Sequence, residues 1–180
     1  MKHKFLEEIA IPEGITCSFS DKIFHCSKAS KKLERKIYIP GVGIKIEDGK
    51  IVFSAKKGNK KTLACIKTWC AHIRNLFSGL EKEFVYKMEI CNVHFPMTVK
   101  VEGSKFVVTN FLGEKENRVA NILDNVEVKI NGVNVEVKSI DLERAGQTAA
   151  NIEKATLVRK RDRRVFQDGI FITSKPGVEA

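Results

Sequence analysis

The chain carries the same pattern of strands and turns twice, and this internal duplication restricts the possible folds more than any other feature of the sequence. Two alternating runs joined by a short turn occupy residues 15–27, and a similar pair occupies residues 97–110. A second pair follows in each copy, at residues 43–54 and 126–137. An offset of 83 residues relates Lys22 to Lys105 and Ile39 to Ile122. Apolar alternation with a period of two on both sides of a short turn indicates a β-hairpin, so each copy is predicted to contain two hairpins.

The second hairpin of each copy has a recognisable turn. Asp48-Gly49 and Asn131-Gly132 predict two-residue turns, because Asn, Asp and Gly tolerate the positive φ that such turns require. After each helix described below, a further strand is expected, at residues 84–91 and 169–173.

One helix is predicted in each copy. Apolar residues recur at helical spacing over residues 61–80, and Gly79 is expected to end this helix. The second helix is expected over residues 141–158, with Asp141 as its N-cap. Its predicted buried stripe is narrow and consists of Ala145, Ala149, Ile152 and Thr156.

These elements predict an α+β fold made of two duplicated modules. Each module is expected to be an antiparallel sheet that a single helix covers on one face. We place an N-terminal module at residues 1–82 and a C-terminal module at residues 83–180.

Charge is distributed unevenly between the two modules. The chain has a formal net charge of +10 and a pI near 9.4, which favours a polyanionic partner. Residues 1–82 hold 17 basic and 8 acidic residues, whereas residues 83–180 hold 15 and 14. Basic charge alone does not separate RNA from DNA or from an anionic membrane surface.

The basic residues of the second module concentrate in residues 159–164, which read RKRDRR. Such runs are often no more than solvated loops. Arginine dominates this run whereas lysine dominates the rest of the chain, and a planar guanidinium binds two phosphate oxygens and stacks on bases. The composition of the run therefore favours a nucleic acid.

The sequence lacks the common signatures of catalysis, metal binding and membrane insertion. It has no P-loop, no Gly-x-Gly-x-x-Gly before a helix, no His-Glu-x-x-His and no Gly-x-Ser-x-Gly. The five cysteines form no Cys-x-x-Cys pair, so we expect reduced core residues without a metal. No apolar run reaches the roughly 20 residues of a spanning helix, and no export segment is expected at residues 1–10. Two alternatives remain open: a regulator that binds DNA or RNA, and an enzyme that uses Cys and His.

Three groups of residues resemble a known family. The first combines AHIRN at 71–75 with YKM at 86–88 and HFPMTV at 94–99. The second is NFLGEK at 110–115. The third joins GQTAANIEKAT at 146–156 to RVFQDGIF at 164–171. Over its whole length the chain resembles the universal large-subunit ribosomal protein family L-six, in its archaeal branch, whose eukaryotic members are called L-nine.

The resemblance implies a non-enzymatic protein without a cofactor, located in the cytoplasm within the large ribosomal subunit. Its implied partners are large-subunit ribosomal RNA, near the base of the lateral stalk and the factor-binding region, and neighbouring ribosomal proteins, with no membrane or small-molecule substrate. We expect the C-terminal module to supply most RNA contacts, with Arg and Lys on phosphates. The candidate RNA-binding residues are Arg159, Lys160, Arg161, Arg163, Arg164, Lys115, Arg118, Gln147, Asn151, Lys154 and Lys175.

Some candidates have a plain structural interpretation. Gln147 and Asn151 lie four residues apart on one helical face, which can equally be a solvated face. Phe166 is expected to be a core anchor rather than a stacking platform, and Asp168-Gly169 to form the turn into the last strand.

The chain also departs from the family pattern. Phe171 stands where relatives usually have Tyr. Residues 79–84 lack the usual Thr and second Gly, and residues 26–35 lack the usual Gly-Pro-Lys-Gly turn. We therefore expect the loop at 26–35 to have a conformation of its own.

Overall fold

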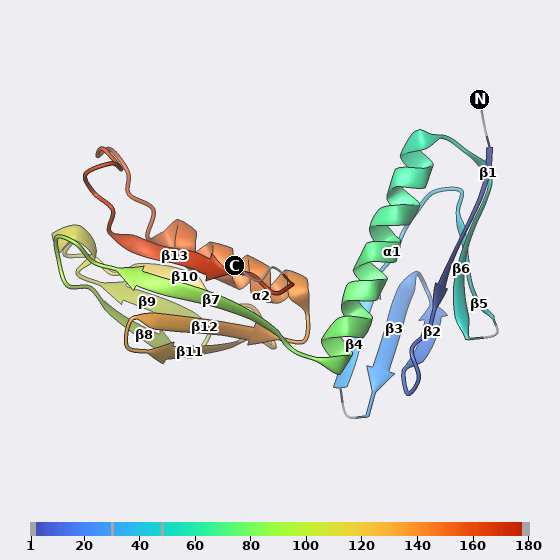
Figure 1. Ribbon diagram of the computed structural model, residues 1–180, viewed down its shortest axis with the longest axis horizontal. Helices are drawn as coiled ribbons and strands as arrows, with labels where there is room; N and C mark the ends of the chain where they lie inside the picture. The colour runs from blue at the N-terminus through green and yellow to red at the C-terminus, as the bar shows by residue number, and fades with distance from the viewer. Residues whose placement is uncertain (1–2, 30, 48, 178–180) are drawn as a thin grey trace. The chain divides into compact units, whose positions relative to one another are not determined.

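The computed structural model describes residues 3–29, 31–47 and 49–177. The chain forms two compact units, Met1–Lys82 and Glu83–Ala180, and Figure 1 shows one helix with its own set of strands in each. Both units are α+β with antiparallel strand pairing, which confirms the predicted fold class.

The first unit divides its strands between two small sheets. One has the order β1-β6-β5 and the other the order β2-β3-β4, and helix α1 packs against strands of both. The elements are β1 (His3–Ala10), β2 (Thr16–Ser20), β3 (Ile23–Lys28), β4 (Lys31–Lys36), β5 (Gly43–Glu47), β6 (Lys50–Gly58) and α1 (Lys60–Glu81).

The second unit follows the same plan with one additional strand. Its sheets have the orders β11-β12-β7-β13 and β10-β9-β8, and helix α2 packs against β10, β7, β12 and β13. The elements are β7 (Phe84–Cys91), β8 (Thr98–Glu102), β9 (Lys105–Thr109), the 3-10 turn η1 (Phe111–Gly113), β10 (Arg118–Asn121), β11 (Glu127–Asn131), β12 (Asn134–Ser139), α2 (Leu142–Ala155) and β13 (Gly169–Ser174).

The four predicted hairpins are present, as β2-β3, β5-β6, β8-β9 and β11-β12. One turn differs from its prediction, because Asn131 is still paired with Asn134 and the loop residues are Gly132 and Val133. Gly132, with a φ of 61°, supplies the positive φ at the first loop position. Of the other predicted turn, Asp48 lies outside the described residues, and Gly49 has a φ of 70°.

The strand predicted at residues 84–91, after the first helix, is part of the second unit. As β7 it is a central strand of the second unit, paired with β12 on one side and β13 on the other. Its counterpart is β1, which pairs with β6 in the first unit and was not predicted. The charged residues of β1 make its strand pattern hard to recognise in the sequence. In the structure one of them, Glu8, is exposed and its carboxylate pairs with the Lys50 ammonium at 3.1 Å. Two further strands, β4 and β10, extend the first hairpin of each unit and were also not predicted.

Both helices differ from their predicted bounds at the C-terminal end. Helix α1 continues past the buried Gly79 to Glu81, so this glycine is not a helix stop. Helix α2 ends at Ala155, because Thr156 leaves the helix and its hydroxyl accepts a hydrogen bond from the Ile170 amide at 2.9 Å. The predicted buried stripe of α2 is confirmed, since all four of its members are buried.

The core of the second unit lies between α2 and the strands. Its largest fully buried side chains include Phe106, Phe111, Met88, Ile152 and Ile170. Burial of several side chains of this size stabilises each by about 1.5–3 kcal/mol. This core supports the segment 156–168, which carries the basic run.

Candidate RNA interface

The basic run lies in the loop between α2 and β13, and all five of its cationic residues are exposed. Within the part of the chain that the structure describes, Arg159, Lys160 and Arg163 form no ion pair. The run begins at Arg159, after Thr156, Leu157 and Val158, which follow the C-terminal end of α2.

Asp162 shapes the run from within. Its carboxylate accepts a hydrogen bond from the Arg164 amide at 2.9 Å and pairs with the Arg164 guanidinium at 2.8 Å. The hydrogen bonds from Arg164 lower the pKa of Asp162. The Asp162 backbone carbonyl accepts hydrogen bonds from the amides of Val165 and Phe166. The run is therefore a closed turn rather than an extended strand. The Arg164 side chain is nevertheless 90% exposed.

Phe166 holds the end of the run in place. Its half-buried ring stacks on the His94 ring, with centroids 4.8 Å apart and an interplanar angle of 29°. The Arg161 guanidinium lies 4.7 Å from the centroid of the Phe166 ring, a cation–π distance. Phe166 therefore packs against the core, as predicted, and also orients a cation of the run.

Asp168 anchors this assembly, a role that the sequence analysis missed. Its buried carboxylate accepts hydrogen bonds from the Val93 and His94 amides, both at 2.9 Å, and lies 2.7 Å from His94 Nδ1. Burial acts to raise the pKa of Asp168, but hydrogen bonds from the His94 amide and ring and from the amides of Val93 and Phe95 outweigh it and lower the pKa. Asp168, which was expected to form a turn with Gly169, thus acts as a clamp that holds the loop to Val93 and His94, 75 and 74 positions earlier in the chain.

Arg118 is an internal bridge in this structure. Its guanidinium forms two hydrogen bonds with Glu114, at 2.8 and 2.6 Å, and donates to the carbonyls of Ala155 and Leu157, at 3.0 and 2.9 Å. It also lies 4.1 Å from the centroid of the Phe111 ring. Arg118 therefore satisfies carbonyls at the end of α2 rather than presenting its fork to solvent.

Two lysines lie beside the basic run. Lys154 lines the same pocket as Arg163 and Arg164. Lys115 is exposed and directly follows Glu114, whose pKa is lowered by its hydrogen bond with Arg118 and, more weakly, by the charges of Arg118 and Arg161. The effect of the Arg161 charge on the pKa of Glu114 indicates that Glu114 lies near the run.

The remaining candidates are farther from the run. The Gln147 side chain donates to Asn151 at 2.8 Å, and Asn151 donates to the Asn121 carbonyl at 3.1 Å. Both thus join α2 to β10. Lys175 follows the end of β13 that pairs with Lys87, and the run precedes the opposite end of that strand.

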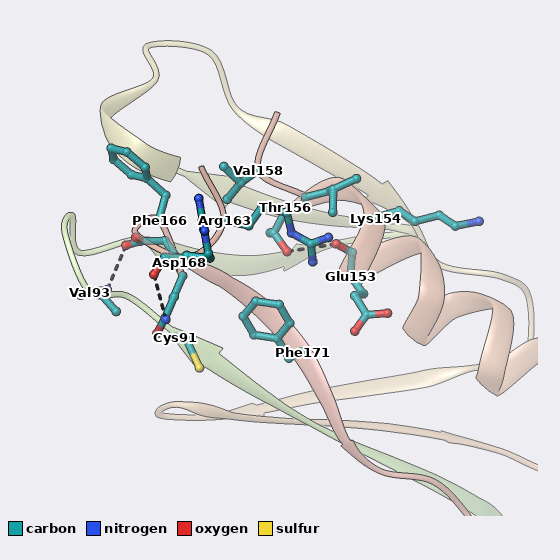
Figure 2. Close-up of a pocket in the computed structure, with 13 residues that line it drawn as sticks. Cys91, Val93, Glu153, Lys154, Thr156, Val158, Arg163, Phe166, Asp168 and Phe171 are labelled. Carbon is teal, nitrogen blue, oxygen red and sulfur yellow. Dashed lines mark hydrogen bonds between the residues drawn. The ribbon is translucent and has the colours of Figure 1, made fainter. Parts of the chain in front are cut away.

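A pocket of about 790 Å³ opens beside the run, and Figure 2 shows the side chains that surround it. Its wall includes Phe171 of β13, Lys154 of α2, Cys91 of β7, and Arg163 and Phe166 of the connecting loop. No sequence signal marked this pocket, because Cys91 and Val93 in its wall are distant along the chain from the other lining residues, which lie between Glu153 and Phe171.

Neither a metal site nor a membrane span is evident within residues 3–29, 31–47 and 49–177. No group of three or more potential ligands from His, Cys, Asp and Glu is close enough to hold a metal ion. Neither helix there is long and apolar enough to cross a membrane.

Fold and loop together define a basic α+β protein built by duplication, with an arginine-rich loop anchored on its second unit. The family model of ribosomal protein L6 matches residues 95–169, which include Asp168, the arginine-rich loop and α2. The large ribosomal subunit protein uL6 of Methanosarcina mazei is 41% identical over 97% of this chain and 99% of its own length. The uL6 protein of Methanocella arvoryzae is 41% identical over 94% of the chain and 97% of its own length. The chain therefore belongs to the ribosomal protein L6 family of the large ribosomal subunit, which confirms the resemblance.

Proposed function

We propose that this protein is a structural component of the large ribosomal subunit whose second unit binds large-subunit ribosomal RNA. Following the resemblance, we place it near the base of the lateral stalk and the factor-binding region, beside other ribosomal proteins. Membership of the ribosomal protein L6 family supports the ribosomal role. The exposed, anchored arginine loop supports the RNA contact.

The observation that carries the proposal is the way in which the cations are held. A mobile arginine loop loses conformational entropy when it binds, whereas this loop is closed by Asp162 and fixed by Phe166, His94 and Asp168. The guanidinium groups remain exposed and can form two hydrogen bonds each to phosphate. The primary phosphate contacts of the proposal are Arg159, Lys160, Arg161, Arg163 and Arg164.

The other candidates contribute in different ways. Lys154 and Lys115 adjoin the run and extend its positive surface. Arg118 supports the loop rather than touching RNA. Gln147, Asn151 and Lys175 are proposed as peripheral contacts to sugar or phosphate, because they lie on α2 and beyond the far end of β13.

The test is RNA binding as a function of salt. Replacing Arg161, Arg163 and Arg164 together by Ala should weaken binding to large-subunit ribosomal RNA. It should also reduce the slope of log affinity against log salt by about 2–3, because each phosphate contact contributes roughly 0.7–0.9. A matched control replaces three exposed lysines on other strands, Lys100, Lys105 and Lys129, and should change the slope less.

An unchanged slope in the triple arginine variant would remove the run from the interface. Sedimentation of the tagged chain from lysate is the companion measurement. Co-migration with large subunits that survives a high-salt wash is expected, whereas a chain found only in the free fraction would contradict the ribosomal role.

A further inference from the structure

The pocket beside the basic run is not accounted for by phosphate binding. Contacts to phosphate need cations at the surface, and these can sit on a flat or convex loop. Here the cations Arg163 and Arg164 border a hollow of about 790 Å³. Hollows of about 300–1,000 Å³ are the size in which proteins hold small organic ligands.

An aromatic ring forms part of the pocket wall. Phe171 projects from β13 and is 37% exposed, and Figure 2 shows its ring facing the hollow between the Cys91 and Glu153 side chains. Its position is defined by Gly169, since a Cβ atom built on Gly169 would lie 2.9 Å from Phe171 Cζ. The absence of a side chain at Gly169 thus leaves room for the ring in this place.

The charges around the pocket also match a nucleotide. Its cations are Arg163, Arg164 and Lys154, and all three are exposed. Its carboxylates are bonded to backbone amides of the protein itself: Asp168 accepts from Val93 and His94, and Glu153 accepts from Ile172 at 3.3 Å. A ring-lined hollow with exposed cations suits an anionic ligand that carries a flat apolar face.

We propose that this pocket receives one unpaired base of the bound RNA, stacked on Phe171, while Arg163 and Arg164 hold the phosphates that flank it. RNA-binding proteins recognise single-stranded nucleotides in this way, by stacking bases on aromatic rings and neutralising the adjacent backbone. The proposal rests on the RNA-binding function above and adds the kind of RNA element that is bound, a bulged or looped nucleotide rather than a continuous helix.

The experiment uses the full chain with large-subunit ribosomal RNA. Affinity is measured at one fixed salt concentration, and base reactivity in the complex is mapped with dimethyl sulfate and a carbodiimide. Phe171→Ala removes the ring, Phe171→Leu keeps an apolar side chain without a π face, and Phe171→Tyr keeps the ring. Val165→Ala is the matched control, because Val165 is 59% exposed in the same loop but does not line the pocket.

Loss of one stacked base should weaken binding by roughly 5- to 150-fold in the Ala and Leu variants, with the salt slope retained. The Tyr variant and the Val165 control should bind like the original chain. A single base should be protected from the reagents in the original complex and become reactive in the Ala and Leu variants. Thermal melting of the free variants shows whether each is folded, and the Leu variant keeps the packing that Ala loses.

Two results would overturn the proposal while leaving RNA binding intact. One is unchanged affinity and an unchanged reactivity map in folded Phe171→Ala and Phe171→Leu variants. The other is normal binding to naked RNA combined with loss of these variants from assembled subunits, which would assign the pocket to a protein neighbour. If the original chain itself fails to bind the RNA, the proposed function fails, and this inference fails with it.

Discussion

Replacing Asp168 by Asn tests whether an ionised carboxylate holds the loop in place. Asn has nearly the same shape and can keep the two amide hydrogen bonds from Val93 and His94 through its carbonyl oxygen. It cannot keep the charge, and its NH2 group faces His94 Nδ1 in place of the carboxylate oxygen at 2.7 Å. The variant therefore isolates the contribution of the charge.

The size of the effect follows from these three contacts. A hydrogen bond to a charged group contributes about 1.5–3 kcal/mol and a neutral one about 0.5–1.5 kcal/mol. In the Asn variant each of the two amide hydrogen bonds falls from a charged to a neutral contribution, and the His94 contact is disrupted. The smaller desolvation cost of burying a neutral group offsets part of this loss of stability. We expect Asp168→Asn to lower the free energy of unfolding by about 3 kcal/mol. For a domain of the size of the second unit, Glu83–Ala180, this loss lowers Tm by roughly 12–24 °C.

The pH dependence has a definite sign. The pKa of Asp168 lies below its usual value of 3.8 in the folded protein, so the folded state binds this proton less readily than the unfolded state does. The stability that the ionised Asp168 adds is fully present at pH values above its usual pKa. It is lost as the pH falls through the lower pKa that Asp168 has in the folded protein. The stability difference between the original chain and Asp168→Asn should therefore be largest near neutral pH and shrink below about pH 4.

Differential scanning calorimetry of the full chain between neutral pH and pH 3 provides the measurement. Asp162→Asn is the matched control, because Asp162 is an exposed carboxylate in the same loop and its replacement should change Tm little. An equal Tm for Asp168→Asn and the original chain at neutral pH would refute the clamp. A Tm difference that stays constant down to pH 3 would refute the role of the charge.

Three further substitutions test other contacts by urea unfolding. Arg118→Lys should lower the free energy of unfolding by about 2 kcal/mol, because an ammonium group cannot pair with both Glu114 oxygens and also donate to two carbonyls. The salt slope of RNA binding should not change in this variant, and a reduced slope would instead indicate that Arg118 contacts phosphate. Ile152→Ala should cost about 2–5 kcal/mol, since Ile152 is 0% exposed in the core of the second unit, and a loss under 1 kcal/mol would contradict that packing. Asn59→Ala should cost about 1 kcal/mol through loss of the capping box at the start of α1, and an unchanged midpoint would mean that the cap does not contribute.

Local patterns in the sequence were enough to predict the hairpins and the helices. The alternation in residues 15–27 and 97–110 and the helical stripe at Ala145, Ala149 and Ile152 depend on neighbours a few positions apart. These patterns appear in the structure as β2-β3, β8-β9 and the buried face of α2. Helix ends were less well predicted, since Thr156 leaves the helix to accept a hydrogen bond from Ile170, a residue 14 positions away.

Strand partnership could not be predicted in the same way. The pattern of residues 84–91 predicts a strand but not its partners, which are β12 and β13 in the structure. Likewise β1 becomes a strand by pairing with β6, forty or more residues later in the chain. A period of two shows which residues share a face but carries no information about the neighbouring strand.

The candidate site likewise has features that local sequence determines and features that only tertiary contacts create. The sequence by itself determined the duplicated α+β plan, the family and the concentration of arginine at residues 159–164, because each is written in residue types and their local spacing. Only the tertiary structure decided that Arg118 faces inward, that Asp168 clamps the loop to His94, and that Phe171 and Cys91 share a pocket. Those roles arise from contacts between segments that are distant along the chain, and such contacts exist only once the core has brought the segments together.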